Sequence, residues 1–148
     1  MKIFVDADSC PVKQEILTLA KEYKIEAVFV ASIRHMMNQT MEGTWKYVDP
    51  DAEAADLYIF NHLQKGDVLV TQDIGLAGLA LSKQVNVVSP RGHVYHEDNM
   101  ANELHFRHLA AKARRSGVYS KGPKAFTDAD NSRFMVNMKN ILSQAAGR

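Results

Sequence analysis

The sequence predicts an α/β protein, specifically a three-layer α/β/α sandwich on a mostly parallel, five-stranded sheet. Short segments rich in β-branched and aromatic residues alternate with segments whose apolar residues recur at helical spacing. The order strand, helix, strand with a short return implies a right-handed crossover and a parallel pair. Two of the predicted strands end in aspartates, at the sheet edge where ligands bind in such folds.

Five segments are predicted as strands. The first is short and β-rich, and it ends abruptly in Asp6 and Asp8, which identifies a buried strand with an acidic tip. The fourth again ends in an acid, Asp73. Residues 91–96 are predicted as a loop. The predicted strands are Lys2 to Val5, Ala27 to Ala31, Thr44 to Val48, Asp67 to Thr71 and Val85 to Val88.

The remaining periodic segments are predicted as helices. Pro11 is expected in the first turn of the first helix, where its fixed φ fits and its missing N–H is not needed. Thr127 is expected to cap the last helix. The predicted helices are Pro11 to Lys24, Asp51 to Gln64, a segment starting at Gly75, Glu97 to Arg115, and Asp128 to Ala145.

Length and composition indicate one globular domain over residues 1–148, with the basic, helical third 91–148 packed on the same core. The one cysteine, Cys10, rules out an internal disulfide and fits a reducing compartment. Because there is no long apolar run, we expect neither a membrane span nor a signal peptide, and hence a cytoplasmic protein. The sequence leaves open whether the chain forms a homodimer.

Charge is distributed unevenly although the net charge is only +1. Residues 49–73 hold six acids against one lysine, whereas residues 91–124 hold seven Lys and Arg against three acids. This pattern suits a metal ion beside a phosphate chain, although solvated loops of opposite sign that never meet would look the same. The candidates for phosphate contacts are Lys13, Arg91, Lys121 and Lys124.

Four aspartates are the candidate site. If the first and fourth strands are neighbours, the crevice between their tips receives Asp6, Asp8 and Asp73, with Asp56 entering from a helix. Each close carboxylate pair repels by about 4 kcal/mol at the effective dielectric of a protein surface, so a counter-charge is needed. An all-carboxylate set suits Mg²⁺ or Mn²⁺, which can activate water and clamp a phosphodiester. The structural alternatives are that Asp8 or Ser9 caps the helix after Cys10 and that Asp73 caps the helix at Ile74.

These residues resemble a known signature. The segments Ile3 to Asp8, Ala55 to Ile59 and Gly66 to Ala77 resemble the acidic motifs of PIN-like domains, and Val5 to Lys13 with the Thr-Gln-Asp block resembles the bacterial YaiI/YqxD family. The resemblance covers nearly the whole chain. It implies a PIN-type sheet and Mg²⁺- or Mn²⁺-dependent cleavage of RNA or single-stranded nucleic acid by Asp6, Asp56 and Asp73, with Asp8 added. Where PIN nucleases usually carry a further glutamate, this sequence offers Glu42.

Three functions are compatible with the sequence. The first is a metal-dependent nuclease that acts on RNA. The second is a degenerate PIN-like module that binds nucleic acid or protein without cleavage. The third is a phosphatase in which Asp6 is the nucleophile and Asp8 the general acid. Cys10 lies near a helix start, but without the arginine of a cysteine phosphatase loop at Ile16 we interpret it as a packed thiol.

Overall fold

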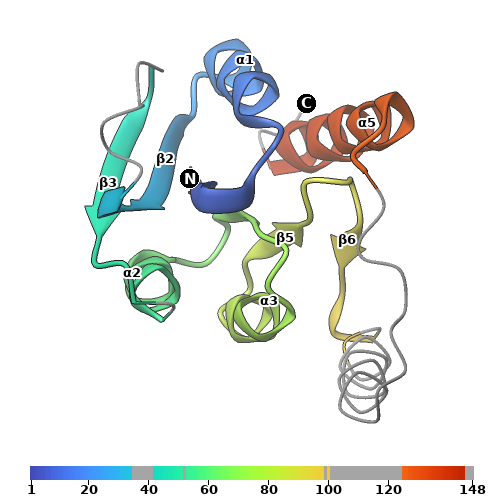
Figure 1. Cartoon of the computed structure of the whole chain (residues 1–148). Coiled ribbons are helices and arrows are strands. Elements are labelled where there is room, and N and C mark those ends of the chain that lie inside the picture. The colour runs from blue at the N-terminus through green and yellow to red at the C-terminus, as the bar shows by residue number, and fades with distance from the viewer. Residues whose placement is uncertain (35–41, 52, 99, 101–124, 146–148) are drawn as a thin grey trace, which may run out of the picture.

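The structure is a computed structural model that describes residues 1–34, 42–51, 53–98, 100 and 125–145. Six strands form a sheet in the order β3-β2-β1-β4-β5-β6 (Figure 1). Their bounds are β1 (Lys2–Asp6), β2 (Glu26–Ser32), β3 (Thr44–Val48), β4 (Val68–Val70), β5 (Asn86–Val88) and β6 (Val94–Tyr95).

The first five strands are parallel, as predicted, and β6 pairs antiparallel with β5. β6 lies in the segment 91–96 that was expected to be a loop, so the predicted number of strands was one too low. A tight turn connects β5 to β6. In this turn, Ser89 N–H donates to His93 O at 2.8 Å and Gly92 N–H donates to Ser89 O at 2.9 Å. A strand of two residues is too short to show a period in the sequence.

Helices cover both faces of the sheet. α1 (Lys13–Tyr23) and α5 (Asp128–Ala145) lie on one face, and α2 (Ala54–His62) and α3 (Ile74–Ser82) lie on the other (Figure 1). This arrangement confirms the three-layer prediction. The predicted helix from Glu97 to Arg115 lies mostly outside the described residues, which omit 101–124.

The chain between β1 and α1 differs from the prediction. A short 3-10 helix, η1 (Ala7–Ser9), follows β1, and α1 begins only at Lys13. Pro11 therefore lies in the turn before the helix and not in its first turn. Cys10 N–H closes η1 by donating to Ala7 O, so the chain still lies in a turn at Pro11.

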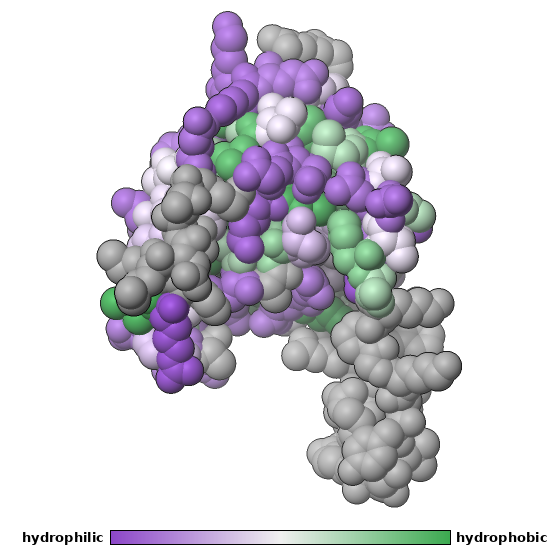
Figure 2. Space-filling model, turned by 45° about the horizontal axis from the view of Figure 1, so that its top comes forward, coloured by the Kyte–Doolittle hydropathy of each residue, from purple (hydrophilic) through white to green (hydrophobic). Residues whose placement is uncertain are grey.

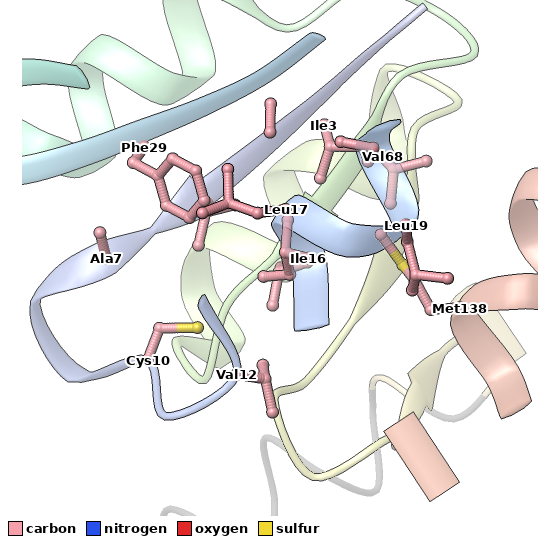
Figure 3. Packing of buried hydrophobic residues seen from close by; sticks show 14 of the residues in the cluster. Ile3, Ala7, Cys10, Val12, Ile16, Leu17, Leu19, Phe29, Val68 and Met138 are labelled. Carbon is pink, nitrogen blue, oxygen red and sulfur yellow. The ribbon is translucent and has the colours of Figure 1, made fainter. Parts of the chain in front are cut away.

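Two hydrophobic cores hold the layers together. Side chains alternate across β1, so Ile3 and Val5 face α1 and α5, whereas Phe4 faces α2 and α3. Figure 3 shows part of the first core, where Met138 of α5 lies near residues of α1. Because each fully buried large apolar side chain contributes roughly 1.5 to 3 kcal/mol, these cores fix the sheet that carries the site.

The surface is mixed in character. On the face shown in Figure 2, hydrophilic residues predominate and hydrophobic ones gather in small groups between them. Among the helices that the structure describes, none has the length and apolar character that crossing a membrane requires.

Candidate acidic site at the carboxyl edge of the sheet

The candidate site lies where the strand order reverses. β1 pairs with β2 on one side and with β4 on the other, in the register Phe4 with Leu69 and Val5 with Val70. The prediction that the first and fourth strands are neighbours is therefore confirmed. As a result, Asp6 at the end of β1 lies beside the segment that follows β4 and contains Asp73.

Asp6 is held by a hydrogen bond from the neighbouring strand. Its Oδ2 accepts from Thr71 Oγ1 at 3.2 Å. Burial raises the pKa of Asp6, and the negative charges of Asp8 and Asp73 raise it further, whereas the Thr71 hydrogen bond lowers it. The carboxyl therefore lies among other acids in a partly desolvated place.

Asp73 has a structural role as well. It is the N-cap of α3, and its Oδ1 accepts from Leu76 N–H at 3.1 Å. Its own N–H donates to Thr71 Oγ1 at 3.0 Å, so Thr71 joins the two acids. The interpretation that Asp73 caps this helix is confirmed. A capping role uses one carboxylate oxygen and is compatible with a second role for the other.

Asp56 approaches the same place from the first turn of α2. Its pKa is raised to about 6, first by burial and then by the charge of Asp73, a hydrogen bond with Asp73, and the charges of Asp6 and Glu53. A hydrogen bond between two carboxyl groups requires a proton on one of them. The contact with Asp73 therefore favours the protonated form of Asp56, and the charge of Asp6 favours it further.

Asp8 is oriented by the backbone of β2. Both of its carboxylate oxygens accept from Ser32 N–H, at 2.8 and 3.1 Å. The alternative that Asp8 or Ser9 caps α1 is wrong, because the N-cap of α1 is Val12, which makes no side-chain capping bond. Both oxygens of Asp8 thus act as acceptors, whereas the general acid of a phosphatase has to donate a proton.

Two residues at this site, Glu53 and Thr71, were not predicted from the sequence. Glu53 directly precedes α2, and its charge raises the pKa of Asp56. For Glu53 the signal was present in the sequence, because residues three apart share a side of a helix start, and that spacing relates Glu53 to Asp56. Strand spacing gives no such signal for Thr71, because Thr71 and Asp73 both follow the end of β4 at Val70.

Two other acids lie at the opposite edge of the sheet. Glu42 lies two residues before β3, exposed, and forms an ion pair with Lys21. Asp67 precedes β4 and accepts from Lys2 N–H at 2.9 Å and from Gln64 N–H at 2.8 Å. Because residues before parallel strands lie at the amino edge, neither acid can join the group around Asp6, and the candidacy of Glu42 is wrong.

Two of the four basic candidates, Lys13 and Arg91, lie among the described residues. Lys13 is the first residue of α1. The Arg91 guanidinium forms an ion pair with Asp130 at 2.9 Å, a structural contact that the sequence did not predict. Lys121 and Lys124 lie outside the described residues. A role of these four side chains in phosphate contact stays a prediction.

Cys10 is packed and not nucleophilic, which confirms the interpretation from the sequence. It is 4% exposed and belongs to the core that α1 and α5 cover (Figure 3). Burial raises the pKa of the thiol to about 11. The reactive thiolate is therefore scarce at neutral pH.

The donor chemistry of the acidic cluster, Asp6, Asp8, Glu53, Asp56 and Asp73, fits a hard divalent cation. Among the described residues, the charged groups that raise the pKa of Asp6 and Asp56 are all carboxylates. Within those same residues, however, no three Asp, Glu, His or Cys side chains are grouped closely enough to hold an ion. Because a proton and a cation compete for the same carboxyl, the raised pKa of Asp56 would weaken cation binding at low pH.

The chain is similar to the members of one protein family. Residues 4–144 match the family described as the uncharacterized YaiI/YqxD family, DUF188. A UPF0178 protein of Bacillus velezensis is 50% identical over 146 residues, which cover 98% of this chain and 87% of that protein. A UPF0178 protein of Listeria monocytogenes is 47% identical over 141 residues, covering 95% of each chain. No solved structure matches the chain.

Proposed function

Because this chain belongs to the YaiI/YqxD family, whose description carries no activity, we propose a function from its acidic site. The protein is a divalent-cation-dependent phosphodiester hydrolase that cleaves RNA or other single-stranded nucleic acid. The observation that carries the proposal is the convergence of Asp6, Asp56 and Asp73 at the point where the strand order reverses. Burial raises the pKa of both Asp6 and Asp56, and the charge of Asp73 raises both further.

The residues divide the work in this proposal. Asp6, Asp56 and Asp73 hold Mg²⁺ or Mn²⁺, and Asp8, fixed by Ser32 N–H, adds negative charge beside Asp6. Thr71 keeps Asp6 and Asp73 in register through its hydroxyl. The bound cation would supply a water of lowered pKa and a positive charge opposite the phosphate. The choice of nucleic acid rests on the PIN-like motifs and on the basic segment 91–124.

A specific observation favours a second candidate, a module that binds nucleic acid or protein and cleaves nothing. Both Asp8 and Asp73 already accept hydrogen bonds from backbone N–H groups, and the described residues do not present three ligands at ligating spacing. In such a module, the side chains of Asp8 and Asp73 would stabilise the loops that follow the strands, and no ion would be required.

The substitution Asp73→Asn separates the two candidates. Asparagine caps a helix about as well as aspartate, so the variant keeps the cap on α3 and loses the ligating charge. We expect the wild type to degrade an unstructured RNA with Mg²⁺ or Mn²⁺ and to stop when the cation is chelated. We expect Asp73→Asn to cleave at least about a hundredfold more slowly than the wild type, as for the loss of a catalytic group.

The controls decide what a negative result means. Glu22→Gln removes an exposed carboxyl from α1, on the other face of the sheet, and should cleave like the wild type. Anisotropy with labelled RNA measures binding separately from cleavage. Binding by the wild type without cation-dependent cleavage would establish the non-catalytic module. Turnover of a phosphate monoester with an adduct on Asp6 would establish the phosphatase.

A further inference from the structure

A groove between α2 and α3 opens directly beside the acidic cluster. Its volume is about 310 Å³. One end is acidic and the rest is apolar: the lining residues are Glu53, Asp56 and Asp73, then Leu57, Phe60, Gly75, Leu76 and Leu79. The groove therefore shares two carboxyls, those of Asp56 and Asp73, with the proposed cation site.

The apolar walls of this groove are unusually exposed. Leu57 of α2 is 58% exposed and Leu79 of α3 is 51% exposed, although both helices have a well-packed inner face. Below them, Leu76 is buried and belongs to the core under α2 and α3. Leu57 and Leu79 line the groove from different helices and lie outside the buried core, which favours an apolar ligand at this position.

We propose that the groove between α2 and α3 is a nucleobase subsite, which takes an unpaired base of the nucleic acid whose phosphate is held at the acidic cluster. This inference rests on the proposed function and names its substrate class as single-stranded. A base offers two flat apolar faces and can enter a groove only when it is neither paired nor stacked. The volume is at the lower end of small-molecule pockets, which suits one base.

A protein partner is the competing occupant, because the acidic end would attract a basic peptide. The dimensions favour the base. A groove that holds one small molecule is too short for the apolar face of a helix, which spans several turns. The base also explains why the apolar walls are contiguous with the carboxyls proposed to bind the cation and, through it, the phosphate.

The test compares two phosphates that differ only in the base. Adenosine 5′-monophosphate and ribose 5-phosphate are titrated calorimetrically into the protein with Mg²⁺. We expect the nucleotide to bind about tenfold more tightly, the lower part of the range for stacking one base on a protein. Leu79→Gln should bring the affinity for the nucleotide down to that for ribose 5-phosphate and leave the affinity for ribose 5-phosphate unchanged.

A control variant and a second groove variant test whether the loss of affinity is specific to the groove. Val136→Gln replaces an equally exposed apolar residue on α5, in the opposite layer, and should keep the full advantage of the nucleotide. Leu57→Gln probes the other wall and should reproduce the loss seen with Leu79→Gln. Both groove leucines are more than half exposed, so the fold tolerates the polar side chain, and amide spectra of each variant check this.

The outcomes are distinct. Equal affinity of the wild type for the two phosphates, or a nucleotide advantage that both leucine variants retain, would overturn the subsite and leave the hydrolase standing. Failure of both phosphates to bind with Mg²⁺ would overturn the cation site and the subsite together. Equal phosphate affinities, combined with binding of a basic, leucine-containing peptide that Leu79→Gln abolishes, would assign the groove to a protein partner.

Discussion

The hydroxyl of Thr71 lies between two of the acids. It donates to Asp6 Oδ2 at 3.2 Å and accepts from Asp73 N–H at 3.0 Å, and the residue is 1% exposed. A hydroxyl has one proton to donate and can accept at the same time, so one side chain fixes both neighbours. The positions of Asp6 and Asp73 therefore depend on each other through a residue that carries no charge.

Asp56 should make stability depend on pH. Its pKa is about 6 in the folded protein, against 3.8 when unperturbed. The folded state then binds the proton more tightly, so stability falls as pH rises from about 4 to about 6 and stays lower above that. We expect Asp56→Asn to be more stable than the wild type at pH 7.5, by less than about 1 kcal/mol because the half-buried carboxyl is screened by solvent.

Urea unfolding at several pH values measures this effect. The difference between the two proteins should shrink as the pH falls from about 6 and should vanish only below 3.8, where the wild-type carboxyl is protonated in both states. Glu22→Gln, on an exposed part of α1, should show no such crossover. A wild type that equals or exceeds Asp56→Asn in stability at pH 7.5 would contradict the close approach of Asp56 and Asp73.

At the scale of elements, the contact between the β5–β6 turn and α5 decides how the last helix docks. Asn137 Nδ2 donates to Gly92 O at 2.6 Å, and Arg133 Nη1 donates to Arg91 O at 3.1 Å. Asp130 accepts from both Arg91 and Arg133. Side chains of α5 thus satisfy two carbonyl groups of the turn, and Arg91 takes part through both its carbonyl and its side chain.

Gly92→Ala should loosen this contact. The glycine has a φ of +90°, and a Cβ there would lie 2.6 Å from the Arg133 carbonyl carbon and from Phe134 N. We expect a loss of about 1 to 2 kcal/mol from the left-handed backbone and a further 1 to 3 kcal/mol from displacing α5. Denaturant unfolding measures the total.

A matched control isolates the close approach. Gly66 has nearly the same φ, +89°, but a Cβ there would meet nothing within 4 Å. Gly66→Ala should therefore cost only the backbone part. Equal losses for the two variants would show that α5 moves away from the turn without cost.

At the scale of the whole molecule, cation binding should be linked to folding. A ligand that binds only the folded state stabilises it by about 3 kcal/mol at a hundredfold excess over Kd. For a chain of this size that raises the Tm by about 5 to 10 °C. We expect this rise with Mn²⁺ at pH 7.5, monitored by circular dichroism. It should be smaller at pH 5, where the Asp56 proton competes with the cation.

Asp6→Asn is the decisive variant for that linkage. It removes the acid at the end of β1 and should abolish most of the Mn²⁺-dependent rise in Tm, whereas Glu22→Gln should retain it. An equal rise in Asp6→Asn and wild type would place the bound cation elsewhere on the molecule.

Much of the fold was predictable because it depends on local pattern. Thr44–Val48 was predicted to the residue and the last helix from Asp128 to about Ala145, since an alternating β-rich segment and a long amphipathic stripe are strong signals. The placement of Asp6 and Asp73 at one edge followed from strands that end in acids. β6 and the displaced start of α1 were missed, because a two-residue strand and a 3-10 turn depend on contacts made after the chain is folded.

The sequence by itself determined the layered α/β fold and the acidic ends of β1 and β4, because hydrophobic period and strand termini are properties of neighbouring residues. Only the tertiary structure decided which acids belong together. Glu53 joins Asp56, whereas Glu42 and Asp67 lie at the far edge, as strand order and direction require. The raised pKa of Asp56 was likewise decided there, because desolvation and charge repulsion depend on distance in space and not along the chain.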